Sequence, residues 1–184
     1  MAKMMKGIAA ISGSCFLFTL IGLFFIQREI FLPLSITCGT VFYHFFMRLL
    51  VGWTVNGIFR NRMNYTARWF SPLPFERRLY SFLKVKKWKK HLPTYSPETF
   101  SIKDRSLEQL AMATCQAETV HEIIILFSFL PLLLAIPFGE LPVFFGTSLL
   151  GATVDLLFVM IQRCNRPILV RLIERKKNES EKTA

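Results

Sequence analysis

The chain of 184 residues is both strongly apolar and strongly basic. Hydrophobic residues make up 52% of it, including 19 phenylalanines, which is too apolar for an ordinary soluble domain. A net charge of +11 suits either a nucleic acid or an anionic membrane surface, and the long uncharged segments described below favour the membrane over nucleic acid. The four cysteines form no CxxC pair, so we predict neither a metal site nor a disulfide framework.

Two membrane spans are predicted in the first third of the chain. Residues 7–26 carry no charge and are long enough to cross the hydrocarbon core, which favours a retained span over a cleaved signal peptide. After a tight connection, the second span is predicted over residues 30–56. It contains His44 and Arg48, one helical turn apart. Because a charge inside a span is costly, we expect Arg48 to face the bundle or to snorkel to the cytoplasmic side.

The segment from residue 60 to residue 118 is predicted to be a cytoplasmic insert. Within it, residues 75–90 fit a single helix with an apolar stripe and with lysines gathered around Trp88 at its end. This pattern is typical of an interfacial helix on an anionic membrane surface, although a solvated basic face remains the alternative. Further along, Asp104 or Ser106 can cap the helix that becomes the third span.

The remaining spans are predicted over residues 120–136 and 143–161. Pro131 predicts a kink in the third span. The fourth span carries Asp155, and Pro167 suits the first position of a new amphipathic helix over residues 167–177, lying on the membrane. The expected fold is therefore a single all-α integral membrane domain, with four transmembrane helices and additional cytoplasmic interfacial helices.

Charge asymmetry predicts the orientation of these spans. Lysines and arginines concentrate at the N-terminus, in the insert and in the tail, whereas the two short turns hold only Arg28. The positive-inside rule therefore predicts a multi-pass protein of the plasma membrane with both termini in the cytoplasm. The oligomeric state is left open.

Two ionisable residues in the predicted spans suggest a contact between spans two and four. Arg48 and Asp155 both lie towards the cytoplasmic side of this topology, and pairing them would offset part of the cost of each charge. Such a pair would lie beside His121, and His44 could join it. Independent snorkelling of Arg48, with Asp155 exposed to water, is an equally good interpretation.

A cluster of polar residues lies where the insert runs into the third span. Glu118, His121 and Glu122 occupy positions i, i+3 and i+4, and therefore share one face of a helix. A histidine flanked by carboxylates suits proton transfer, because its pKa is near neutrality and a carboxylate can fix its tautomer. From these residues alone, however, a hydrated helix end is the preferred interpretation.

Three segments together resemble the glycosyl-4,4'-diaponeurosporenoate acyltransferase family, which performs the last step in making the carotenoid staphyloxanthin. The family has K/R-x-W-K, A-E-x-x-H and I/V-Q-R-Y-N-R-P-R stretches. This chain has Val85-Lys86-Lys87-Trp88-Lys89, Ala117-Glu118-Thr119-Val120-His121 and Ile161-Gln162-Arg163-Cys164-Asn165-Arg166-Pro167, in the same order and at similar spacing. The resemblance spans about residues 75–172. It departs at Cys164, which replaces the aromatic residue, and at Ile168, which replaces the arginine after the proline.

The resemblance implies a membrane acyltransferase with no bound cofactor. A fatty acyl group would move from an activated carrier, an acyl-coenzyme A or acyl-carrier-protein thioester, to a hydroxyl of a glycosylated carotenoid or other membrane glycolipid. Since no motif for a serine or cysteine nucleophile is visible, we expect direct attack by the acceptor, with His121 as general base and Glu118 as its orienting carboxylate.

The resemblance also implies where the substrates bind. The expected donor- and substrate-binding residues are Arg163, Arg166, Asn165, Gln162, Trp88 and Lys87, with the two arginines on donor phosphates. Anchoring of the two arginines by the positive-inside effect is the alternative for that pair. A non-enzymatic membrane lipid-binding or assembly protein is the alternative for the whole chain.

Overall fold

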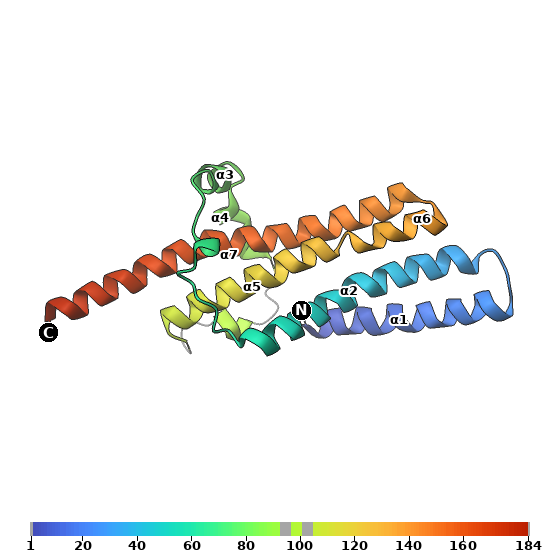
Figure 1. Cartoon of the computed structure of the whole chain (residues 1–184), viewed down its shortest axis with the longest axis horizontal. Coiled ribbons are helices and arrows are strands. Elements are labelled where there is room, and N and C mark those ends of the chain that lie inside the picture. Colours follow the sequence, from blue (N-terminus) through green and yellow to red (C-terminus); the bar gives the residue numbers. More distant parts are fainter. Residues whose placement is uncertain (1, 93–96, 101–104, 184) are drawn as a thin grey trace.

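Four long helices lie lengthwise beside one another in the structure, a computed structural model that describes residues 2–92, 97–100 and 105–183 (Figure 1). They are α1 (Ala2–Phe25), α2 (Phe31–Phe59), α5 (Leu107–Phe127) and α7 (Leu141–Thr183). α5 continues through the 3-10 helix η4 (Leu130–Leu134) into α6 (Ala135–Phe138). All regular structure in the described residues is helical, and four helical segments are long and apolar enough to cross a membrane. The predicted all-α membrane fold is therefore confirmed.

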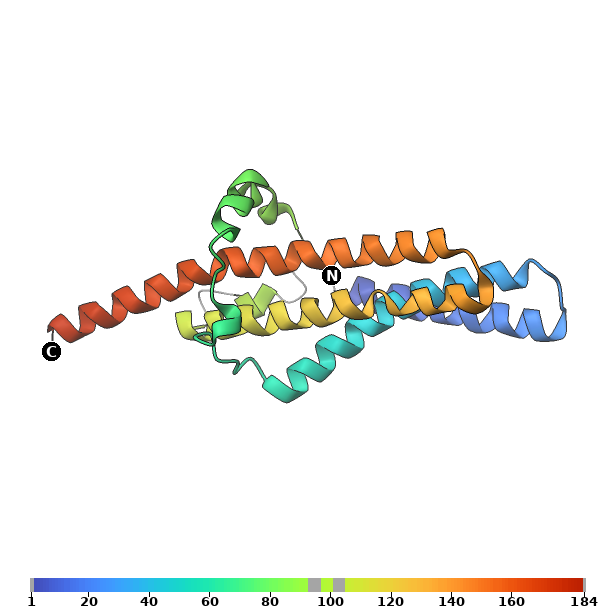
Figure 2. The same cartoon turned by 45° about the horizontal axis from the view of Figure 1, so that its top comes forward.

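The four helices form two hairpins. α1 packs against α2, α5 packs against α7, and α2 and α5 make the principal contact between the hairpins. A small apolar core lies at that contact and consists of Met47, Val51, Val55 and Ile124. Both short turns lie at one end of the bundle, whereas the insert and the C-terminal part of α7 lie towards the other (Figures 1 and 2).

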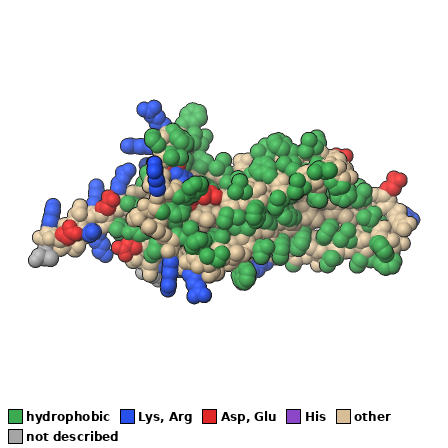
Figure 3. Space-filling view, viewed as in Figure 1, with side chains coloured by type: hydrophobic (Ala, Val, Ile, Leu, Met, Phe, Trp, Pro, Cys, Tyr) green, Lys and Arg blue, Asp and Glu red, His purple; other side chains and the backbone are tan. Residues whose placement is uncertain are grey.

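The surface separates into an apolar part and a basic part. Hydrophobic side chains cover the bundle, while lysines and arginines gather around the insert and the end of α7 (Figure 3). Phe24, Phe25 and Ile136 each leave more than three quarters of their surface exposed. Burial of such side chains in lipid would be favourable, so this distribution agrees with a multi-pass membrane protein.

The insert consists of short helices rather than one long one. They are η1 (Arg68–Phe70), α3 (Glu76–Phe82), α4 (Val85–Trp88), η2 (Lys89–His91) and η3 (Pro97–Phe100). The prediction of one helix over residues 75–90 is wrong, because Lys84 adopts a left-handed conformation with φ 51° and interrupts it. The Trp88 indole then donates a hydrogen bond to the Leu83 carbonyl, which satisfies one of the groups freed by the break.

The start and the kink of the third span follow the sequence. Ser106 caps α5 in a capping box with Gln109, as predicted, while Asp104 lies outside the described residues. The α-helix ends at Phe127, and Pro131 lies in the 3-10 segment that follows. The α-helix is therefore interrupted where the kink was predicted, because proline cannot donate the backbone hydrogen bond that would continue it.

The predicted separate tail helix is wrong. α7 runs without interruption from Leu141 to Thr183 and carries Pro167 in its interior. The tail predicted over residues 167–177 is therefore a continuation of the fourth span that projects beyond the bundle (Figure 1). Proline removes the hydrogen bond to the carbonyl four residues earlier and crowds that carbonyl, but the side chains of Arg163 and Arg166 hold the turn before it against the neighbouring helices.

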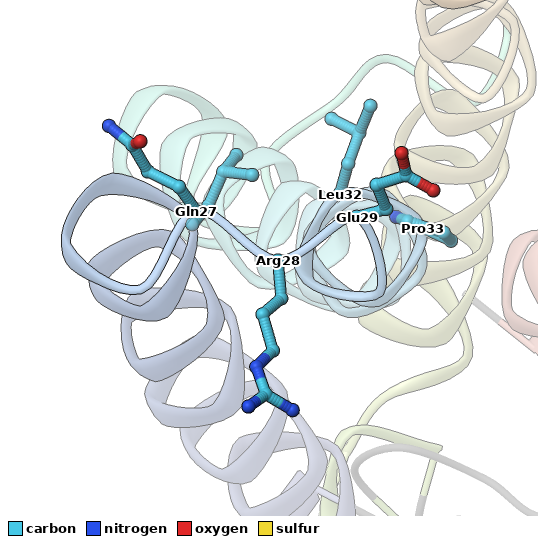
Figure 4. Close-up of a pocket in the computed structure, with 6 residues that line it drawn as sticks. Gln27, Arg28, Glu29, Leu32 and Pro33 are labelled. Atoms are coloured by element: carbon cyan, nitrogen blue, oxygen red, sulfur yellow. The ribbon is translucent and has the colours of Figure 1, made fainter.

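A shallow hollow opens at the turn between α1 and α2 (Figure 4). It is lined by Leu23, Gln27, Arg28, Glu29, Leu32 and Pro33. The turn lies at the opposite end of the bundle from the insert. It holds none of the residues that the sequence singled out as a candidate site.

Candidate active site

The interface between α5 and α7 carries a buried ion cluster at its insert end. Glu118 is completely buried and pairs through its two oxygens with Arg163 and Arg166. The distance from Arg163 Nη1 to Glu118 Oε1 is 2.6 Å, and Arg163 Nε lies 2.5 Å from Glu76 Oε1. Glu76 is itself buried and comes from α3, so the cluster joins three helices.

The same arginines also bind backbone carbonyls of the insert. Arg163 donates to the carbonyls of Trp69 and Ser71, and Arg166 donates to that of Phe70. Arg166 leaves only 2% of its surface exposed, and its guanidinium lies 4.8 Å from the centre of the Phe70 ring. Both guanidinium groups therefore fasten η1 and the start of α3 to the α5–α7 pair.

Tyr80 borders this cluster from α3. Burial raises the pKa of its phenol to about 12, and the nearby Glu76 carboxylate acts in the same direction. The phenol is therefore neutral at physiological pH and can donate a hydrogen bond.

These contacts bear on two predictions. Arg163 and Arg166, which were predicted to bind donor phosphates, have guanidinium groups that are paired with buried carboxylates and carbonyls. The structure contradicts the prediction that Glu118 orients His121. Glu118 shares a helix with His121, but its carboxylate turns towards the arginines of α7.

A second polar cluster lies further along the same interface. His121 Nδ1 lies 2.8 Å from Asp155 Oδ1, and Arg48 Nη2 lies 2.6 Å from Asp155 Oδ2. Arg48 also donates to the carbonyls of His44, at 2.7 Å, and Gly151, at 3.2 Å. The predicted pairing of Arg48 with Asp155 is confirmed, and Asp155 takes the place beside His121 that was assigned to Glu118.

The His121 side chain is partly exposed. The imidazole stacks on Phe158 with ring centres 4.8 Å apart, and its side chain is 22% exposed. The ring contacts Asp155 through its Nδ1 atom. A carboxylate only accepts hydrogen bonds, so in the neutral form of the ring Nδ1 is the donor to Asp155 and Nε2 is the acceptor.

The other predicted site residues lie nearer the insert than the His121–Asp155 pair. Asn165 accepts a hydrogen bond of 2.5 Å from Lys89 Nζ. Ten residues separate Asn165 from Asp155 on α7, which is about 15 Å along a helix. Lys87 is exposed on α4, Trp88 is tied to Leu83, and Gln162 is buried on the inner face of α7.

Sequence reasoning missed Glu76 and Gly151. Glu76 is the one acidic residue between Arg60 and Lys90, and a lone carboxylate in so basic a segment is a signal for an ion pair. Gly151 of α7 faces the side chains of Arg48 and His44 on α2. A Cβ atom there would lie 3.1 Å from Arg48 Nη2 and 3.5 Å from His44 Nδ1, and no pattern in the sequence reveals this.

The second cluster is suited to general base catalysis. A carboxylate on Nδ1 fixes the tautomer and stabilises the imidazolium that forms when Nε2 takes a proton. The first cluster, by contrast, has no exposed nucleophile or base and is suited to holding helices together. The candidate catalytic group is therefore His121, with Asp155 and Arg48 behind it.

Comparison with known proteins agrees with this chemistry. The model of the glycosyl-4,4'-diaponeurosporenoate acyltransferase family matches residues 66–175, which is more than half of the chain and includes both His121 and Asp155. No match was found among curated proteins or among solved structures. His44 and Arg48 lie on α2, before the matched residues. This multi-pass membrane protein belongs to the glycosyl-4,4'-diaponeurosporenoate acyltransferase family, a family of acyltransferases whose members act on a carotenoid glycoside.

Proposed function

We propose that the protein transfers a fatty acyl group from a thioester directly to a sugar hydroxyl of a membrane-bound carotenoid glycoside, with His121 as general base. The observation that carries this proposal is the contact of 2.8 Å between His121 Nδ1 and Asp155 Oδ1. The contact gives a polar pair with a partly exposed imidazole edge, within helices that are otherwise apolar.

The reaction needs a single proton carrier. His121 Nε2 takes the proton of the acceptor hydroxyl while the hydroxyl oxygen attacks the thioester carbonyl. As the tetrahedral intermediate collapses, the new ester C–O bond remains and the C–S bond breaks. The departing thiolate receives the proton from the His121 imidazolium, so the enzyme returns to its starting state.

Arg48 supports this step from α2. Its guanidinium lies 2.6 Å from Asp155 Oδ2, so its positive charge offsets the negative charge of the carboxylate in surroundings with little water. Asp155 can therefore hold the His121 ring in place through its contact with Nδ1. In this scheme Arg48 and Asp155 are positioning residues, and His121 is the group that touches the substrate.

The thioester donor requires a basic surface elsewhere. Since Arg163 and Arg166 are occupied by carboxylates, we assign the phosphates of an acyl-coenzyme A or acyl carrier protein to the exposed bases of α3 and α4. These are Arg77, Arg78, Lys86 and Lys87. With both termini in the cytoplasm, as charge asymmetry favours, this surface would meet donors made in the cytoplasm.

The test is an acyl-transfer assay in membranes that contain the protein, with radiolabelled acyl-coenzyme A and a purified carotenoid glycoside. His121→Ala should lower the rate by ~10²–10⁴-fold while the protein stays folded. The matched control is His91→Ala, because His91 is exposed in η2, outside the apolar bundle. A His121→Ala rate within about twofold of the parent would remove His121 from the mechanism, since general bases contribute far more than that.

A further inference from the structure

His44 is a buried polar side chain that the acyl-transfer step does not use. It leaves 9% of its surface exposed, and neither ring nitrogen has a hydrogen-bond partner among the described residues. Buried polar groups are nearly always paired, because an unpaired one keeps the desolvation cost of burial without compensation. An unpaired histidine, which has two polar ring atoms to satisfy, is therefore a candidate for binding a ligand.

The position of His44 links it to the catalytic pair. Its carbonyl accepts a hydrogen bond from Arg48, which binds Asp155, which in turn binds His121. Across the bundle, the His44 ring faces Gly151, one helical turn before Asp155 on α7. The absence of a side chain at Gly151 lets the ring and the Arg48 guanidinium approach α7 closely.

The chemistry of a neutral imidazole narrows the class of ligand. One nitrogen donates and the other accepts, and a sugar hydroxyl likewise does both. A phosphate would instead favour a cationic partner, and a thioester carbonyl would use only the donor nitrogen. α2 is one of the four helices that could span a membrane, so an amphiphile dissolved in the bilayer would meet the outer face of this helix.

We propose that His44 binds a sugar hydroxyl of the glycolipid acceptor, next to the hydroxyl that His121 deprotonates. This inference rests on the proposed acyl transfer and adds a substrate-binding residue from outside the part of the chain that matches the family. His44 fixes the acceptor sugar, and the His121–Asp155 pair acts on it.

The test replaces His44 by Leu and by Gln in the full-length protein. His44→Leu should raise the KM for the carotenoid glycoside about tenfold, the loss expected for one hydrogen bond, and leave the KM for acyl-coenzyme A within about twofold. His44→Gln keeps a donor and an acceptor and should recover part of the acceptor affinity. The His44→Leu protein should be as heat-stable as the parent or more so, because no hydrogen bond within the protein is lost.

Ser35→Ala is the matched control, because Ser35 is another buried residue of α2 whose side chain has no partner in the described structure. It should change neither KM. Binding of the glycoside alone, measured as a thermal shift without donor, separates this inference from the proposed function. If the parent protein binds the glycoside but transfers no acyl group, the proposed acyl transfer is refuted. The role of His44 is still tested in that case, by comparing glycoside binding between the parent and His44→Leu.

Three results would overturn the assignment of His44. The first is an unchanged affinity of His44→Leu for the glycoside. The second is an equal rise in both KM values. The third is a loss of heat stability in both variants, which would mean that the ring has a purely structural role.

Discussion

Replacing Glu118 by Gln should destabilise the fold rather than slow the chemical step. The substitution keeps the size of a fully buried side chain and removes its charge. Arg166, with 2% of its surface exposed, then loses its carboxylate partner, and Arg163 keeps Glu76 as its one carboxylate partner among the described residues. A buried guanidinium would be left without compensation between α5 and α7.

The magnitude follows from the burial of these groups. Removing one partner of a buried ion pair typically costs ~3–5 kcal/mol. We expect the lower end of this range, about 3 kcal/mol, because Arg163 retains Glu76 and Arg166 retains its bonds to the Phe70 and Thr114 carbonyls. Adding Arg166→Met to Glu118→Gln removes the uncompensated charge, so the double variant should lose less stability than the sum of the single losses, by ~1–3 kcal/mol.

The assay measures thermal unfolding of the purified protein in mild detergent. Samples are heated to a series of temperatures, and gel filtration then gives the fraction that remains folded at each temperature. Glu181→Gln provides the matched control. Its pair with Lys177 is exposed, with N and O 3.9 Å apart, and exposed pairs of this kind contribute little. If Glu118→Gln unfolds at the same temperature as the parent, or if the double variant loses the full sum, the ion cluster does not hold the helices together.

Three further predictions concern the rest of the bundle. Arg48→Gln and Asp155→Asn should each lower kcat in the membrane assay. The fold-reduction in kcat of the double variant should be smaller than the product of the two single fold-reductions, because each single change disrupts the same pair. In a cysteine-free background, a membrane-impermeant maleimide should label Glu140→Cys in intact cells and Lys176→Cys only after lysis; the reverse would invert the topology. Pro167→Ala should keep activity and match or exceed the parent in stability, since α7 is already continuous there, and a loss of activity would show that the proline is needed.

The sequence predicts those features of the fold that depend on local chemistry. Uncharged runs predict the spans, because a bilayer tolerates few charges. Ser106 predicts the start of α5, and Pro131 predicts its end, through the backbone hydrogen bonds that each residue accepts or fails to donate. Arg48 and Asp155 are each costly alone in an apolar span, so their pairing is one of two equally good interpretations of the sequence, and the structure shows the pair.

The partners of the site residues depend on how two helices face each other, which the sequence does not reveal. Glu118 and His121 share a face of α5 by spacing, yet the register of α7 decides that Glu118 meets the two arginines and His121 meets Asp155. An arginine suits a phosphate and a carboxylate equally well, so the role of Arg163 depends on Glu76, which arrives from a distant insert. The break at Lys84 likewise depends on tertiary contacts, because lysine rarely adopts a left-handed conformation by itself.

The two polar clusters are linked because they lie on the same pair of helices. Glu118 and His121 are one turn apart on α5, and their partners Arg163 and Asp155 lie about two turns apart on α7. Sliding α5 against α7 by one turn would move the facing residues by about 5.4 Å, which would break the contact of 2.8 Å between His121 and Asp155. The buried ion cluster therefore sets the register that the catalytic pair requires. The same sliding would separate Arg166 from Thr114, so the bonds that fix the register extend along α7 from Asp155 to Arg166, next to Pro167, and a lipid environment makes them costly to break.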